Sequence, residues 1–238
     1  MALDGIYAAV SGLRAASTRL NQRSHNLANV STPGFTPRRV DLADARGGGV
    51  QATGTSPMGA GPVVPTDHPL DLALDGGGFF VLNDGQGGRL YSRAGNFVLD
   101  KQGSLVDPLG RSLSPSIQIP REAAQVHVTA QGKVQALAAD GSVLYEGRIK
   151  TASFGNPGGL ESVGGNAFRE TAASGPPVTD APGTPGHGQV ISGALQASGV
   201  DIAREMVGLI TDQRYFEANL KTIQTEDEML GSILDVVS

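Results

Sequence analysis

The stretch Ile202–Val237, IAREMVGLITDQRYFEANLKTIQTEDEMLGSILDVV, carries the longest regular pattern in this chain. Eleven positions separated alternately by four and three residues run through it, and nine are apolar: Ile202, Met206, Leu209, Gln213, Phe216, Leu220, Ile223, Asp227, Leu230, Leu234 and Val237. Five heptads of this spacing predict a long helix with a narrow apolar stripe, which Asp201 can cap at its first turn. We expect the stripe to meet a coiled-coil-like partner. An ordinary core helix is the alternative, but the flanking segments offer little apolar surface to receive it.

A second helix is predicted near the N-terminus, from Gly5 to Val30. Its stripe follows the same alternation, and serines occupy two of the seven stripe positions: Ile6, Val10, Leu13, Ser17, Leu20, Ser24 and Leu27. The helix is expected to stop at Ser31-Thr32-Pro33-Gly34, because proline removes a backbone donor and glycine permits a positive φ. Residues 1–35 are therefore assigned to an N-terminal assembly helix and residues 193–238 to a C-terminal one.

The two ends of the chain carry opposite charge. Residues 1–40 hold five arginines against one aspartate, a net +4, whereas residues 199–238 hold three basic against eight acidic residues, a net −5. This asymmetry favours pairing of the N-terminal helix with the C-terminal one over pairing of like with like. The alternative is two solvated faces whose charges only keep the chain soluble.

Between the helices the pattern changes to short runs with period two, separated by glycine turns. The candidate strands are Phe79–Leu82, Leu90–Arg93, Phe97–Leu99, Ser104–Val106, Ile117–Ile119, Val126–Val128, Val134–Leu137 and Val143–Tyr145. They predict a mainly antiparallel all-β domain at residues 67–171. Residues 36–66 and the Gly/Pro-rich residues 172–192 are interpreted as extended or flexible linkers. The fold class is therefore α+β, with paired terminal helices flanking the β domain.

Composition excludes several classes of protein. The chain has 238 residues, 34 of them glycine, and it has no cysteine, which excludes disulfide scaffolds, cysteine nucleophiles and iron–sulfur centres. A net charge of −5 gives no support for nucleic-acid binding. No run of 18 apolar residues predicts a membrane-spanning segment, and the N-terminus lacks the pattern of a cleaved signal peptide.

No catalytic, cofactor-binding or metal-binding motif is predicted. Four histidines, His25, His68, His127 and His187, lie in four different segments without metal-ligand spacing. The run Gly76-Gly77-Gly78 precedes a strand, so we interpret it as a turn and not as a phosphate loop. Four residues along a strand would hold the carboxylates at 71 and 75 about 13 Å apart, too far for a retaining glycosidase pair. The aspartates at 100 and 107 lie beside turn residues, where aspartate usually binds its own backbone.

Three segments resemble the bacterial flagellar rod and hook axial proteins. Near the N-terminus, Asn26–Phe35 reads NLANVSTPGF and is similar to the family's N-terminal signature. In the middle, Pro69–Val81 and Tyr91–Phe97 look like its entry into the β domain. Near the C-terminus, Gly193–Asp201 and Gln213–Asn219 resemble its other terminal segment. The resemblance covers nearly the whole chain.

The resemblance implies a structural subunit of the flagellar basal-body rod that polymerises through its terminal helices and transmits torque from motor to hook. The modest β domain is most like the proximal-rod member that carries one, with the distal-rod protein as the alternative. The implied partners are copies of itself, other axial proteins and the flagellar export apparatus, and the implied location is the periplasmic rod, reached without a cleaved signal peptide. No cofactor and no nucleic acid is implied. The expected assembly interface comprises Ile6, Val10, Leu13, Leu20, Leu27, Phe35, Ile202, Met206, Leu209, Phe216, Leu220, Ile223, Leu230 and Leu234.

A second function, from a different class, is a secreted module that binds a periplasmic polymer through the β domain. Such a module needs a concave aromatic or polar patch among the strands. The aromatic residues available for it are Tyr91, Tyr145, Phe79, Phe80, Phe97 and Phe154, of which the three at 79, 80 and 97 are expected in the core.

Overall fold

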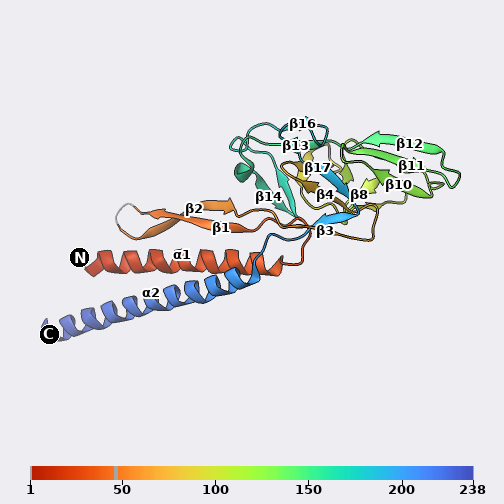
Figure 1. The fold of residues 1–238 in the computed structure, drawn as a ribbon. Helices are drawn as coiled ribbons and strands as arrows, with labels where there is room; N and C mark the ends of the chain where they lie inside the picture. The colour runs from red at the N-terminus through yellow and green to blue at the C-terminus, as the bar shows by residue number, and fades with distance from the viewer. Residues whose placement is uncertain (1, 46–47, 238) are drawn as a thin grey trace. The chain divides into compact units, whose positions relative to one another are not determined.

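The computed structural model describes residues 2–45 and 48–237, which divide into two units (Figure 1). The helical unit comprises residues 1–30, 36–59 and 200–238, and the β unit comprises residues 31–35 and 60–199. The α+β class expected from the sequence is confirmed, because a helix near each end of the chain flanks a mainly antiparallel β region.

Two long helices form the base of the helical unit. Helix α1 spans Ala2–Ala28 and helix α2 spans Ile202–Val237, and they run side by side in opposite directions. Asp201 caps α2 as expected, since its side chain accepts a hydrogen bond from the backbone N–H of Arg204 at 3.1 Å. Among residues 2–45 and 48–237, no helix combines the length and the apolar character needed to cross a bilayer.

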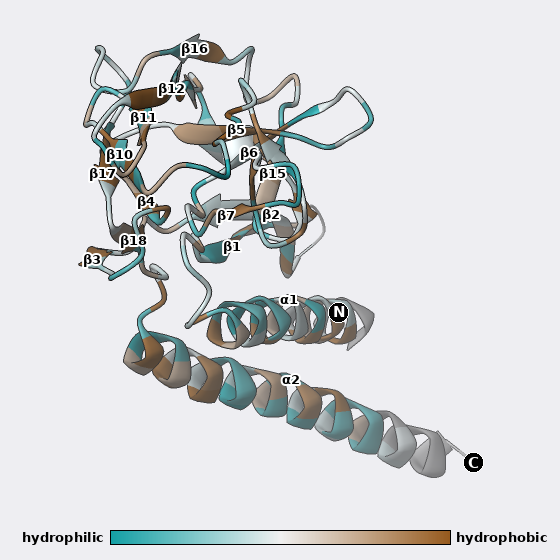
Figure 2. Ribbon diagram, turned by 90° about the vertical axis from the view of Figure 1, so that its right-hand side faces the viewer, coloured by the Kyte–Doolittle hydropathy of each residue, from teal (hydrophilic) through white to brown (hydrophobic). Residues whose placement is uncertain are grey.

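A hairpin lies on the other side of α1 from α2. Strands β1 (Arg38–Asp44) and β2 (Val50–Pro57) pair antiparallel with one irregularity of register, and α1 lies between them and α2 in both views (Figures 1 and 2). The interpretation of residues 36–66 as a loose linker is therefore wrong for this stretch. Six of the eight β2 residues are exposed, so the strand has none of the alternation that predicts strands. Its backbone is anchored instead, for example by the N–H of Val50, which donates to Ser11 Oγ at 3.0 Å.

The β unit is built from short strands. Its described strands are β3 (Val63–Pro65), β4 (Leu72–Asp75), β5 (Phe79–Asn83), β6 (Arg89–Ser92), β7 (Val98–Leu99), β8 (Leu105–Val106), β9 (Ser112–Leu113), β10 (Gln125–Val128), β11 (Lys133–Leu137), β12 (Val143–Arg148), β13 (Thr151–Ser153), β14 (Glu161–Gly164), β15 (Ala167–Arg169), β16 (Val178–Asp180), β17 (Gln189–Ser192) and β18 (Ala194–Gln196), with a 3-10 turn at Pro157–Gly159. The largest sheet has the order β14-β15-β6-β5-β9-β8-β7, with β13 also pairing with β5 and β16. Smaller sheets are β10-β11-β12, β17-β4 and β18-β3.

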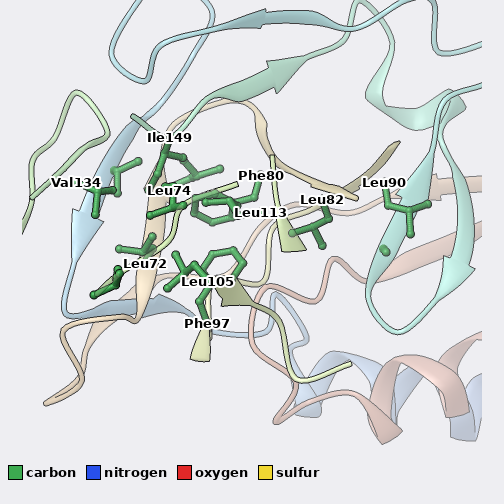
Figure 3. Close-up of a cluster of buried hydrophobic side chains, with 14 of the residues drawn as sticks. Leu72, Leu74, Phe80, Leu82, Leu90, Phe97, Leu105, Leu113, Val134 and Ile149 are labelled. Atoms are coloured by element: carbon green, nitrogen blue, oxygen red, sulfur yellow. The ribbon is translucent and has the colours of Figure 1, made fainter. Parts of the chain in front are cut away.

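Strand β5 lies at the centre because both of its faces are buried. Phe80 and Leu82 point into one apolar cluster, and Phe79 and Val81 enter a second one, as the period of two dictates. Figure 3 shows the first cluster, which gathers side chains from β4, β5, β6, β8, β9 and β11. In the second cluster, Phe79 and Tyr91 each meet the ring of Phe154 edge-on, at centroid distances of 5.9 and 4.8 Å.

The β unit is wider than the expected residues 67–171. Strands β16 and β17 fall within the Gly/Pro-rich segment 172–192 that was interpreted as a linker, and they pair with β13 and β4. The prediction failed because these strands are three and four residues long and bounded by glycine and proline on both sides. Tertiary pairing, and not local pattern, makes them strands.

Tyr91 links the buried core to stability at alkaline pH. Burial, followed by the charge of Glu170 and a hydrogen bond from the Tyr91 hydroxyl to its Oε2 at 3.2 Å, raises the pKa of Tyr91 to about 12. Since the folded state holds this proton more tightly than the unfolded chain, the stabilisation is complete below pH 10 and is lost as the pH rises towards 12. At pH 11, one unit above the ordinary pKa, this difference corresponds to about 1.4 kcal/mol. Urea titrations at pH 8 and pH 11 are expected to show a smaller loss of stability for Tyr91→Phe than for wild type, and equal losses would contradict the assignment.

Candidate functional site: the interface between α1 and α2

The interface between α1 and α2 follows a strict antiparallel register. Gly5 faces Glu226, Gly12 faces Asn219, Arg19 pairs with Asp212, and Asn26 binds Glu205. From one pair to the next, the residue number rises by seven on α1 and falls by seven on α2. The contact line therefore uses one heptad position of each helix, occupied by glycines and polar residues.

Two carboxylates are buried at the end of this contact where α1 finishes and α2 begins. Asp212 accepts a hydrogen bond from Arg23 Nε at 2.6 Å and lies 3.0 Å from Arg19 Nε, while Glu205 lies 3.1 Å from Arg23 Nη1. Both acidic residues are 2% exposed. The Arg19 guanidinium also stacks over the ring of Tyr215 at 5.3 Å. The N-terminal helix thus pairs with the C-terminal one, as their opposite charges favoured, and the charged side chains meet inside the contact.

Arg23 is held between the two carboxylates. Burial lowers the pKa of the Arg23 guanidinium, but hydrogen bonds and charge from Asp212 and Glu205 outweigh it, so that pKa is raised above its usual range. A side chain at Gly208 would collide with this guanidinium. The glycine on α2 therefore makes room for the arginine of α1.

Asn26 joins α1 to both α2 and the hairpin. Its Nδ2 donates to Glu205 Oε1 and to the carbonyl of Arg38, each at 2.8 Å, and its Oδ1 accepts from the Arg38 N–H at 3.1 Å and from Gln22 Nε2 at 3.1 Å. The side chain is 1% exposed, and all of its polar atoms are used. The asparagine of the N-terminal signature thus fixes where the chain leaves the helix to form β1.

The structure shifts the expected contact line by one residue on each helix. On α2, residues 205, 212, 219 and 226 form the contact line in place of the expected residues 206, 213, 220 and 227. On α1, residues 5, 12, 19 and 26 do so in place of the expected residues 6, 13, 20 and 27. The expected residues that are half-buried are Ile6, Val10, Leu13, Leu20, Leu27, Leu209, Phe216 and Ile223. Phe35 belongs to the β unit, where its carbonyl accepts a hydrogen bond from the Gly199 N–H at 3.0 Å. The side chains of Leu230 and Leu234 lie outside the described part of the chain.

Three of the expected residues remain uncovered. Ile202, Met206 and Leu220 are 49%, 52% and 42% exposed. Figure 2 shows hydrophobic segments recurring along the length of α2. The apolar stripe of α2 is therefore wider than its contact with α1, and part of it faces outward within the helical unit.

Sequence reasoning missed the buried polar residues of the contact. Glu205 and Asp212, both buried, entered the sequence analysis only as part of the net charge of residues 199–238. The signal that could have found them is their spacing of seven, matched by Gly5, Gly12, Arg19 and Asn26 at the same spacing on the other helix.

The aromatic residues considered for polymer binding offer little exposed ring surface in the β unit. Five of the six aromatic residues considered for it are buried: Phe79, Phe80, Tyr91, Phe97 and Phe154. Tyr145 packs half-buried against the main cluster. The turn aspartates behave as expected, since Asp100 and Asp107 each accept hydrogen bonds from backbone N–H groups two and four residues ahead. Across residues 2–45 and 48–237, no group of three histidine or acidic side chains is placed to hold a metal ion.

Known proteins share all three parts of this sequence. Residues 6–36 match the model of the flagella basal body rod protein family, residues 73–136 match the flagellar hook protein FlgE/F/G D1 domain, and residues 191–236 match the flagellar basal body rod FlgEFG protein C-terminal region. The chain is 35% identical to the flagellar basal-body rod protein FlgG of Caulobacter vibrioides, over 96% of this chain and 97% of that protein. The chain belongs to the flagellar rod and hook axial protein family. FlgG of Bacillus subtilis is 34% identical over 98% and 99% of the two chains.

Within this family, the likeness to a hook protein is partial. The flagellar hook protein FlgE of Caulobacter vibrioides is 38% identical over 47% of this chain but only 19% of its own length. The full-length likeness to rod proteins and the partial likeness to a longer hook protein agree with the expectation of a rod-type member with a modest β domain.

Proposed function

We propose that this chain is a structural subunit of the flagellar rod that polymerises through α1 and α2 and carries torque from the motor towards the hook. The observation that supports this most is the uncovered part of the α2 stripe. A helix whose apolar surface exceeds its intramolecular contact gains stability when a neighbouring subunit covers the remainder. The polar register inside the chain sets the shape of each building block, and the exposed apolar residues join the blocks.

The chain would pass through the flagellar export apparatus without signal cleavage and assemble in the periplasmic section of the rod, beside copies of itself and other axial proteins. It would act without a cofactor and without catalysis. Immunogold labelling of isolated basal bodies tests this: label on the rod is expected, and its position next to the motor or next to the hook distinguishes the proximal from the distal assignment. Label absent from basal bodies of motile cells would refute the proposal.

Leu220→Asp is expected to impair assembly strongly while leaving the pairing of α1 with α2 intact. Leu220 is exposed in the single chain, so a carboxylate there costs nothing until a neighbour buries it. We expect incorporation into rods to fall by about tenfold or more, the equivalent of at least 1.4 kcal/mol per contact. Helix content by circular dichroism should not change.

Thr222→Asp is the matched control for Leu220→Asp. Thr222 is also exposed on α2, two residues away and on a different side of the helix, so the variant adds the same charge outside the stripe. Normal incorporation is expected. Equal loss in both variants would mean that charge on α2, and not the apolar stripe, limits assembly.

A further inference from the structure

A pocket of about 390 Å³ opens where α1, the hairpin and the first turns of α2 meet, all within the helical unit. Five arginines line it: Arg19, Arg23, Arg38, Arg39 and Arg204. The carboxylates near them are fewer, with Glu205 in the wall, Asp212 behind it and Asp41 paired with Arg39 at 3.3 Å. The pocket therefore carries an excess of positive charge.

The rim of the pocket is partly apolar. Val207 is 64% exposed and Met58 is 38% exposed, and both line the opening. An occupant that matches this surface presents carboxylates for the arginines together with an apolar side chain for the rim.

The far end of α2 has this composition. Asp227 and Glu228 are consecutive and exposed, and their side chains make no ion pair or hydrogen bond with the described residues. Met229, which follows them, is 54% exposed. We propose that the acidic turn at 227–229 of one copy docks into the arginine-lined pocket of a second copy, an inference that rests on the proposed function and names a contact within the polymer.

A second copy must supply this turn. Residues 204 and 228 lie on the same continuous helix, and 24 residues of α-helix span about 36 Å, so the acidic turn cannot reach the pocket of its own chain. The contact is heterologous, because the pocket of one copy receives the helix end of another. Such contacts propagate into open helical polymers when the rotation between copies does not close a ring.

A cross-link between two introduced cysteines tests the contact directly. The natural chain has no cysteine, so Arg204→Cys with Glu228→Cys creates the only two thiols. A short bismaleimide applied to isolated rods is expected to join copies into a ladder on a denaturing gel. The pair Arg14→Cys with Glu228→Cys keeps one exposed cysteine on α1 outside the pocket and should give no ladder. Rods that contain the chain but yield no ladder from the 204–228 pair would overturn the proposal, whereas rods that lack the chain would overturn the proposed function.

Charge exchange provides an independent test. Arg39→Glu with Arg204→Glu is expected to lower incorporation by about tenfold or more, as is Asp227→Arg with Glu228→Arg. A cell producing the chain with all four changes should recover to within about threefold of wild type, because each pocket again meets the opposite charge. Arg14→Glu, outside the pocket, should assemble normally. No recovery of incorporation in the fourfold variant would overturn the proposal. Stabilisation of the wild-type chain by inorganic phosphate at constant ionic strength, without any cross-link in the rods, would also overturn it and would assign the pocket to a free anion.

Discussion

Replacing Asp212 with alanine is expected to weaken the contact between α1 and α2 where its charged side chains are buried. The aspartate is 2% exposed and serves both Arg19 and Arg23, so its loss leaves two guanidinium groups without their shared carboxylate. Breaking a buried ion pair from one side typically costs about 3–5 kcal/mol, and because both arginines are partly exposed we expect about 2–3 kcal/mol here. Amide hydrogen exchange along α2 should accelerate accordingly.

Glu217→Ala serves as the control for Asp212→Ala. Glu217 is exposed on the same helix, and its side chain accepts a hydrogen bond from Gln213, one turn earlier, at 3.0 Å. Its removal should change stability by no more than about 0.5 kcal/mol. If Asp212→Ala exchanged no faster than Glu217→Ala, the buried carboxylate would have no part in holding the helices together.

The polar contact has a consequence for specificity as well as stability. Apolar stripes alone tolerate a shift of one heptad, since each register buries similar surface. The full set of contacts that Arg19, Arg23 and Asn26 make with Glu205 and Asp212 forms in the observed register only, because a shift of one heptad would place Asp212 opposite Gly12 or Asn26 instead of Arg19. A polar residue inside a helix contact that fixes register at some cost in stability is the best-attested use of such groups. The register in turn determines which apolar residues of α2 stay exposed for a neighbour.

How far the sequence could predict this site depends on the kind of interaction. Periodicity located both helices and the N-cap at Asp201, because spacing is a local property of the chain. It could not separate the inner half of the α2 stripe from the outer half, since the side facing α1 is decided by partners almost two hundred residues away, such as Arg23 for Asp212. Hydrophobicity then favoured Met206 over Glu205, although the glutamate is the buried residue of the two.

The same limit applies to the strands. Phe79–Leu82 and Val134–Leu137 were predicted because their side chains alternate or are wholly apolar, and the structure has β5 and β11 there. Strand β2 was missed because it lies exposed and polar, held by its backbone to β1 and α1. Ile117–Ile119 was predicted as a strand, but its described pairing is limited to an isolated bridge between Gln118 and Ser104. Burial of both isoleucines, and not a ladder, accounts for its apolar pattern.

Replacing Gly34 is expected to damage the β unit severely, because the residue combines a positive φ with a close approach of backbone. Its φ is +68°, and a Cβ there would lie 2.5 Å from the backbone N of Ala94 and the carbonyl carbon of Arg93. Its own N–H donates to the Gln196 carbonyl at 2.7 Å, so the turn cannot move away without losing this bond. Conformational strain and overpacking each cost about 1–3 kcal/mol, so we expect Gly34→Ala to lose about 2–6 kcal/mol and Gly34→Val to lose more.

Gly110→Ala separates these two causes. Gly110 has a φ of +81°, close to that of Gly34, but open space surrounds the position of its missing Cβ. The variant should therefore show the strain of a left-handed alanine alone, about 1 kcal/mol, in a urea titration of the full chain. The loss of stability must be clearly larger for Gly34→Ala than for Gly110→Ala if the backbone of Arg93 and Ala94 excludes a side chain at position 34. Equal losses would mean that the turn after α1 has room to adjust and that its glycine serves only to reach the left-handed conformation.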